Sequence, residues 1–309
     1  AAGNERNSKL HASPPTIPER GSDSLRWYVP RIEQNQNHIQ LWFSSPNQFK
    51  FRLKNSKGEL TDWISLNNNF VETEFSSGNI CKIYYRRHNQ KDRNKDSCLD
   101  IFIHKGKDEY IQSGYWTLEI RRDGGYVVGG IHAWSEKGIK NGTYFDNHSK
   151  EFITLTIPGT AKHVVTVAAV EFLSDSFSFD IYSAGINTCD DSSLGPTRDK
   201  REDIFNKPTI SAPGEKVCAA MAMSDSGVNE VQGTSFASPH IAGIIALVLS
   251  ARAKQPHLDQ LTASEVLAEI GQATERTARR WDESDGFGVC DASKFFRSLV
   301  PSVSSCFQI

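Results

Sequence analysis

The feature of this sequence that could do chemistry is a serine at the start of an apolar, small-residue helix. A Gly-Thr pair, Gly233 and Thr234, leads into Ser235, and Pro239 follows where the first turn would tolerate it. N–H groups in the first turn of a helix have no partner within the helix and carry partial positive charge. A serine hydroxyl there could attack a carbonyl while its own N–H group stabilises the resulting oxyanion. A capping serine on an ordinary buried helix would share these three residues, so the longer context decides.

That longer context is specific. Residues 233–243 have the sequence GTSFASPHIAG. This segment resembles the serine motif of the subtilase family of serine endopeptidases, G-T-S-x-A-x-P-x-x-A-G, at all seven specified positions. The resemblance implies that Ser235 is the nucleophile of peptide-bond hydrolysis through an acyl-enzyme.

Four other stretches are similar to family motifs in the expected order. Three of them precede the serine motif: residues 158–170, 192–199 (SSLGPTRD) and 207–214 (KPTISAPG). The fourth, residues 285–289 (DGFGV), follows it. Two positions depart from the family pattern: Ala168 replaces a common glycine and Thr209 replaces a common acid.

The chain opens on a segment that bears on the oxyanion. Its first four residues, AAGN, are similar to the subtilase segment whose asparagine amide donates a hydrogen bond to the oxyanion. The resemblance implies that Asn4 is this donor. It also implies that the residues next to Asn4 and Ser235, namely Gly3, Gly233 and Thr234, contact the substrate.

A general base for Ser235 is not evident. The family's aspartate motif (D-[ST]-G) and histidine motif precede A-A-G-N, and we expect neither of them anywhere in this sequence. His240 lies on the same helix and is turned about 140° away from Ser235 at 100° per residue. His163 borders an expected strand and His132 belongs to another region, so neither is a candidate base.

We therefore expect the base and its orienting acid to come from a segment upstream of Ala1. On this view the chain holds half of an active site, is inactive alone, and has that N-terminal half as a partner besides its peptide or protein substrate. The alternative hypothesis is a catalytically inactive pseudoprotease that acts as a binding or regulatory module.

The distance between Asn4 and Ser235, 235 − 4 = 231 positions, indicates an insertion. Compact subtilases need only about a third of it. The additional residues alternate between apolar and polar side chains, which predicts antiparallel strands with one buried face and hence a β-sandwich or jelly roll. The clearest runs are 39–43, 49–53, 83–85, 99–103 and 116–120, and residues 123–125 (DGG) predict a hairpin turn.

Residues 114–118 and 130–134 resemble the jelly-roll insert of clostridial spore-germination subtilases. Such an insert would serve as a structural brace or as a docking module for a substrate or partner. A third hypothesis makes this insert the functional unit, binding carbohydrate or a partner protein.

The remaining chain has the pattern of an α/β domain. Residues 164–170 form a continuous apolar run, typical of a strand buried on both faces. Helices are predicted over 235–251 and over 262–273, the second with a capping box from Thr262 and Glu265. We expect a subtilisin-like doubly wound α/β sheet that lacks its N-terminal half. The expected segments are an oxyanion segment (1–19), an inserted β domain (20–150), the C-terminal catalytic core (151–298) and a tail (299–309).

Composition narrows the partners. A net charge of −2 gives no basis for nucleic-acid binding, and no apolar run is expected to span a membrane. The six cysteines show no metal-ligand spacing, so no metal site is assigned; the resemblance makes calcium a possible ligand without a site. Scattered, unpaired cysteines favour an intracellular protein. Substrate specificity is not encoded in a form that we can interpret.

Overall fold

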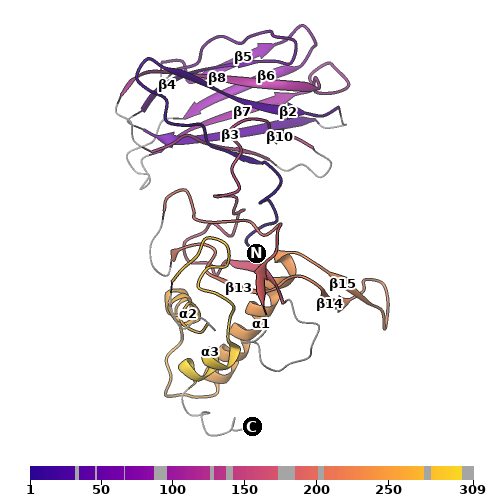
Figure 1. Ribbon diagram of the computed structural model, residues 1–309, viewed down its shortest axis with the longest axis vertical. Coiled ribbons are helices and arrows are strands. Elements are labelled where there is room, and N and C mark those ends of the chain that lie inside the picture. Colours follow the sequence, from indigo (N-terminus) through magenta and orange to yellow (C-terminus); the bar gives the residue numbers. More distant parts are fainter. Residues whose placement is uncertain are drawn as a thin grey trace. The chain divides into compact units, whose positions relative to one another are not determined.

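The computed structural model describes most of the chain in ten ranges. These are residues 1–31, 35–45, 47–65, 67–86, 96–125, 129–136, 142–172, 185–200, 205–274 and 280–300. The chain divides into two compact units, Ser8–Lys150 and Ala1–Asn7 with Glu151–Ile309. We call the first the β unit and the second the α/β unit (Figure 1).

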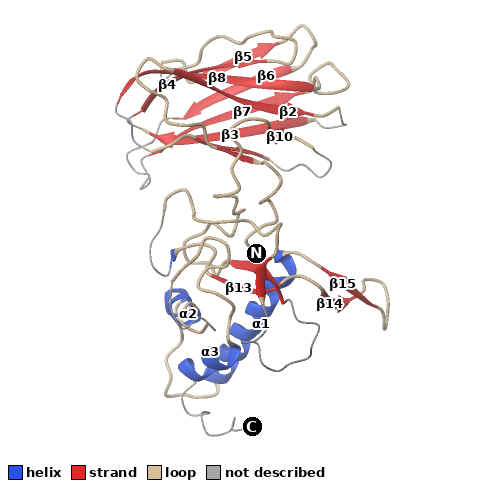
Figure 2. Cartoon of the chain, viewed as in Figure 1, coloured by secondary structure: helices blue, strands red, loops and turns tan. Residues whose placement is uncertain are grey.

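The β unit consists of two antiparallel sheets (Figure 2). A six-stranded sheet has the order β1-β9-β3-β7-β6-β5, and a four-stranded sheet has the order β10-β2-β8-β4. The strands are β1 (His11–Ala12), β2 (Ser22–Val29), β3 (Gln36–Ser44), β4 (Asn47–Lys54), β5 (Phe70–Glu74), β6 (Ile80–Arg86), β7 (Asp96–His104), β8 (Gly114–Gly125), β9 (His132–Ser135) and β10 (Tyr144–Phe145). The unit begins at Ser8 rather than near residue 20, because β1 pairs with β9.

One hydrophobic core lies between the two sheets. The inward positions of β2, β4 and β8 supply Trp27, Phe51 and Trp116, and those of β3 supply Ile39 and Leu41. All five side chains are fully buried. Strict alternation along these strands puts one set of side chains inward, which is why the predicted runs all fall within observed strands. The jelly-roll topology stays a prediction.

The hairpin turn predicted at residues 123–125 is wrong. Strand β8 continues through these residues and pairs with β4, with Gln48 opposite Gly124 and Asn47 opposite Gly125. The register shifts between Gln48 and Phe49, so a bulge rather than a turn accommodates the glycines. Pairing with β4 therefore outweighs the turn preference of the sequence DGG at residues 123–125.

The α/β unit is built around a short mixed sheet. Strand β11 (Val167–Phe172) pairs antiparallel with β12 (Ile186–Thr188) and parallel with β13 (Ile210–Pro213). A separate hairpin is formed by β14 (Val217–Ala220) and β15 (Val228–Val231). The helices are α1 (Thr234–Ala253), α2 (Ala263–Ile270) and α3 (Ala292–Leu299). This three-stranded sheet is what the described residues contain of the expected doubly wound fold.

The secondary-structure predictions for this unit hold with shifted boundaries. The predicted strand begins only at Val167, and the second helix ends at Ile270 with Gly271 as its C-cap. Its capping box is confirmed: Thr262 N–H donates to the Glu265 carboxylate at 2.7 Å, and Glu265 N–H donates to the Thr262 hydroxyl at 3.2 Å. Helix α3, capped by Asp291, was not predicted. Residues 301–309 of the expected tail lie outside the described residues.

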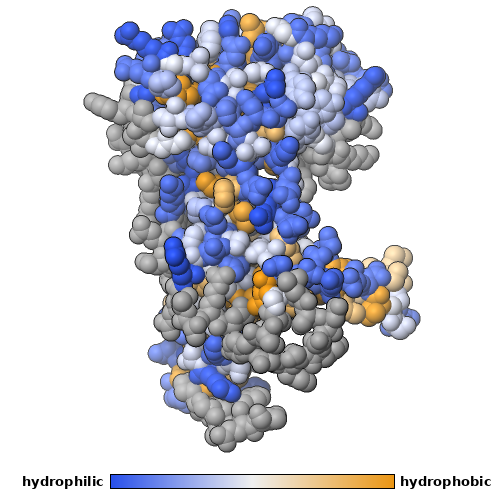
Figure 3. Space-filling view, in the orientation of Figure 1, coloured by the Kyte–Doolittle hydropathy of each residue, from blue (hydrophilic) through white to orange (hydrophobic). Residues whose placement is uncertain are grey.

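Much of the apolar surface of the α/β unit is uncovered. Only Thr234, Ala237, Ile241 and Val248 of α1 are buried, whereas Leu247 is 67% exposed. The β14–β15 hairpin also presents apolar side chains, visible at its tip in Figure 3. By length and composition alone, α1 is long and apolar enough to cross a membrane. This corrects the expectation that the sequence contains no apolar run of that length. The core helix of a soluble domain has the same composition.

Candidate active site

Ser235 lies in the first turn of α1 and is exposed. The helix begins after Gly233, whose φ of 122° favours glycine. The N–H group of Gly233 donates to the carbonyl of Gly214 at 2.7 Å. The turn that presents Ser235 is thereby tied to the segment that follows β13.

The Asn4 side chain binds the residue before Ser235. Its Oδ1 accepts hydrogen bonds from the Thr234 N–H group at 3.0 Å and from the Thr234 hydroxyl at 3.1 Å. The same hydroxyl accepts from the Gly3 N–H group at 3.2 Å. Because two donors fix Oδ1 as the acceptor, Nδ2 is the free donor end of the amide. A Cβ atom on Gly233 would lie 3.1 Å from this Nδ2, so the amide rests against the helix start.

The N–H group of Ser235 is an available donor. Thr234 N–H is used by Asn4, and the N–H groups of Phe236 and Ala237 both donate to the Gly233 carbonyl, at 3.0 and 3.4 Å. Among the residues that the structure describes, Ser235 N–H has no acceptor. Asn4 Nδ2 and Ser235 N–H are therefore two donors without an acceptor among the described residues, and such donors can stabilise developing negative charge.

Backbone hydrogen bonds hold the first residues of the chain in place. Ala2 N–H donates to Val167 of β11 at 2.9 Å, and the Ala2 carbonyl accepts from Thr156 at 3.0 Å. The Gly3 carbonyl accepts from Ser193 at 2.9 Å. Gly3 has a φ of 108°, and a Cβ there would lie 2.7 Å from the Thr156 hydroxyl. The five residues predicted for the site thus come together in the α/β unit.

The three histidines weighed as a general base have other partners. His240 Nδ1 lies 2.9 Å from the Phe236 carbonyl on its own helix, and His163 lies 3.4 Å from the Ser264 hydroxyl. His132 is in the β unit, 3.1 Å from His11. No histidine in the described ranges has a hydrogen bond to Ser235. The letters D-S-G do occur at residues 225–227, but these form the exposed turn between β14 and β15 and follow the AAGN segment instead of preceding it.

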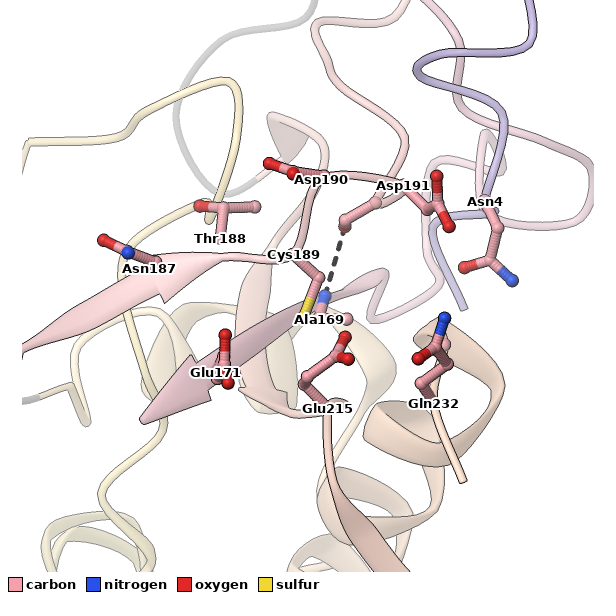
Figure 4. A pocket seen from close by; sticks show the side chains of 12 residues that line it. Asn4, Ala169, Glu171, Asn187, Thr188, Cys189, Asp190, Asp191, Glu215 and Gln232 are labelled. Atoms are coloured by element: carbon pink, nitrogen blue, oxygen red, sulfur yellow. Dashed lines mark hydrogen bonds between the residues drawn. The ribbon is translucent and has the colours of Figure 1, made fainter. Parts of the chain in front are cut away.

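A polar pocket of about 470 Å³ adjoins Asn4 and Gly233 (Figure 4). Sequence reasoning missed it, because its walls come from five separate segments of the chain. Its other lining residues are Ala169, Glu171, Asn187, Thr188, Cys189, Asp190, Asp191, Ser192, Glu215 and Gln232. Burial, followed by the carboxylates of Glu215 and Glu171, raises the pKa of the Cys189 thiol to about 12. This thiol is therefore protonated at neutral pH and is no nucleophile.

Known proteins resemble this chain in its C-terminal part. Residues 141–288 match the model of the subtilase family. The minor extracellular protease Vpr of Bacillus subtilis is 40% identical over 74 residues, which cover 23% of this chain and 9% of Vpr. Pyrolysin of Pyrococcus furiosus is 32% identical over 114 residues, which cover 35% of this chain and 8% of pyrolysin.

The structure of the Clostridium perfringens CspB protease is similar over both units. It superposes with a TM-score of 0.75 at 21% identity, covering 97% of this chain and 58% of that chain. At this identity the likeness shows a shared fold. The chain spans less than a tenth of the two sequence relatives and just over half of the CspB chain. The serine motif and the family match therefore identify residues 141–288 as a segment of the subtilase family of subtilisin-like serine peptidases, and the shared fold agrees.

Proposed function

We propose that this chain supplies the nucleophile and the oxyanion hole of a serine endopeptidase. Ser235 is the nucleophile, and Asn4 Nδ2 together with Ser235 N–H stabilises the oxyanion. The observation that carries the proposal is the pair of hydrogen bonds from Thr234 to Asn4 Oδ1. They leave the amide donor of Asn4 unused by the described residues, and the N–H group of Ser235 at the start of α1 is unused as well.

The chemistry is acyl transfer. The Ser235 hydroxyl loses its proton to a base and attacks the scissile carbonyl carbon, and the carbonyl oxygen becomes the oxyanion. Collapse of this intermediate expels the amine, which takes up the proton, and water then hydrolyses the acyl-enzyme. Gly3, Gly233 and Thr234 line the path of the substrate backbone, and Thr234 also positions Asn4.

The base and its orienting acid come, on this proposal, from polypeptide upstream of Ala1. Two features support this partner: the exposed apolar face of α1 and the 42% of the CspB chain that has no counterpart here. A helix face that exposes Leu247 and Leu249 is suited to burial against another part of a fold. The β unit is then an insertion between the oxyanion donor and the nucleophile. A pseudoprotease is not favoured, because relatives such as Vpr and CspB are named as proteases.

Substitution of the nucleophile in the complete protein tests the proposal. Ser235→Ala should lower peptide hydrolysis by about 10⁴–10⁶-fold, because triad members act as a unit. The control is Ser250→Ala, an exposed serine on the same helix, which should leave turnover unchanged. Turnover retained in Ser235→Ala would overturn the assignment.

A second variant tests the oxyanion donor separately. Asn4→Asp keeps an oxygen to accept from Thr234 but removes the Nδ2 donor and adds negative charge. We expect kcat to fall by at least 10²–10³-fold while the fold is retained. An unchanged kcat would show that Asn4 only holds Thr234 in place.

A further inference from the structure

We propose that the pocket beside Asn4 accepts a positively charged side chain of the substrate peptide, and that Glu215 determines this preference. The inference rests on the proposed protease function, since it assigns a substrate class to the same site. It concerns a specificity-determining residue and adds no step to the chemistry.

The pocket and the catalytic locus share structure. Asn4 and Gly233 line both, and Glu215 directly follows Gly214, whose carbonyl accepts from Gly233 N–H at 2.7 Å. Figure 4 shows the Glu215 and Gln232 side chains on one side of the pocket, facing Asn4 and Asp191 on the other. A peptide whose carbonyl meets Asn4 and Ser235 therefore has a nearby side chain within reach of this space.

The charged residues that the structure describes in the pocket lining are all acidic. Four carboxylates line the pocket, from Glu171, Asp190, Asp191 and Glu215, and none of the described lining residues is Lys, Arg or His. Lys216 neutralises Glu171 at 2.6 Å from outside the pocket lining. In the part of the chain that the structure describes, the other three carboxylates have no ion pair.

Of these three carboxylates, Glu215 would attract a cation most strongly. Asp190 and Asp191 are exposed, so water screens them, whereas Glu215 is half-buried and less screened. Its carboxylate interacts with the Cys189 thiol, which is a weak donor and carries no positive charge. A half-buried carboxylate that has no cationic partner among the described residues is stabilised when a substrate supplies one.

The arrangement suits an organic cation better than a metal ion. In the described residues no group of three His, Cys, Asp or Glu side chains is placed to hold a metal ion. The volume of about 470 Å³ is in the range of ligand pockets and exceeds the needs of an ion. A lysine or arginine side chain could reach Glu215 while its stem lies along Ala169 and Thr188.

The experiment compares peptides that differ by one charge. Peptides carrying lysine or the isosteric neutral residue norleucine, moved through the positions around the cleavage site, are assayed with the complete protein. At one position the kcat/KM ratio of lysine to norleucine should be tenfold or more and should fall with added salt. Glu215→Gln should reduce this ratio to near one. Glu230→Gln, an exposed carboxylate on β15, should preserve it.

Binding separates this inference from the proposed function. The same peptide pair is titrated against the Ser235→Ala variant, and the lysine peptide should bind at least fivefold tighter. Equal affinities, or a preference unaffected by Glu215→Gln, would overturn the pocket assignment even if hydrolysis is observed. Charge-selective binding without hydrolysis in the unsubstituted protein would support the pocket and overturn the protease proposal. If calcium chloride alone displaces the peptide through Glu215, the site is a metal site and the inference fails.

Discussion

The two units bury their apolar residues to different degrees. In the β unit, side chains as large as Trp27, Phe51 and Trp116 are fully enclosed between two sheets of the same unit. In the α/β unit, the longest helix carries leucines on its surface, with Leu247 67% and Leu249 42% exposed. The β unit thus buries its own apolar core. The α/β unit, in contrast, leaves apolar side chains of its longest helix exposed to solvent.

This difference separates two uses of hydrophobic residues. Where a unit closes its own core, each buried side chain contributes to the stability of the isolated chain. Where an apolar face is left open, its contribution depends on the polypeptide that covers it. The following predictions test this contrast in order of decreasing effect.

A matched pair of leucines provides the sharpest test. Leu41→Ala in β3 removes a fully buried side chain and should lower the free energy of unfolding of the β unit by about 2–5 kcal/mol. Leu247→Ala in α1 should change the stability of the isolated chain by less than about 0.5 kcal/mol. Tryptophan fluorescence follows the β unit, which holds five of the six tryptophans, and circular dichroism follows the helices.

The same pair indicates whether α1 is covered in the complete protein. There, Leu247→Ala should become destabilising by about 2 kcal/mol or more, since the side chain is then buried. If Leu41→Ala and Leu247→Ala lower the free energy of unfolding of the isolated chain by the same amount, the contrast between the units is wrong.

A buried carboxylate in the β unit should make its stability depend on pH. Burial alone would raise the pKa of Asp100, but hydrogen bonds from His38 and Gln40 and the Arg86 guanidinium lower it to about 2. A lowered pKa stabilises the fold above about pH 4, and this stability is lost as the pH falls through about 2. Asp100→Asn should therefore cost about 2 kcal/mol at pH 6, and the difference should vanish near pH 2.

Urea unfolding followed between pH 6 and pH 2 measures this effect. Asp108→Asn, an exposed residue of the same unit, serves as the control and should track the unsubstituted protein. A constant difference between Asp100→Asn and the unsubstituted protein across this range would rule out a titrating Asp100.

The smallest expected effect is local to the open unit. Thr262→Ala removes the cap of α2 and should lower stability by about 1 kcal/mol, whereas Thr262→Ser keeps the hydroxyl and should cost much less. Thermal unfolding followed by circular dichroism distinguishes the two. If both variants behave alike, packing and not the cap holds the start of α2.

Sequence patterns predicted the β unit well because its strands bury one face each. Alternation places every second residue inward, so runs such as 39–43 fall within β3. The glycines at 124 and 125 misled the prediction, since local composition cannot show that β4 lies alongside. Helix α3 was missed because eight residues make only about two turns, too few for a helical period to stand out, and its N-cap, Asp291, is a weak signal alone.

The site was predictable only where residues are contiguous or follow a family motif. Asn4 and Ser235 were named from motifs, and the structure adds the hydrogen bonds between Asn4 and Thr234. The pocket could not be predicted, because Glu171, Asp191 and Glu215 become neighbours only through the pairing of β11 with β12 and β13. Nothing in the local sequence around Glu215 indicates that pairing.

The hydrogen bond between Asn4 and Thr234 also has a consequence for the order of folding. It joins residues 230 positions apart, so forming it closes a long loop. Within the β unit, Lys150 N–H donates to the His11 carbonyl at 2.9 Å, which holds the two ends of the unit together. Once its 143 residues, 8–150, have folded, the flexible loop shortens to 230 − 143 = 87 positions. The free-energy cost of closing the loop then falls by about 0.9 kcal/mol. Early folding of the β unit therefore assists assembly of the catalytic locus.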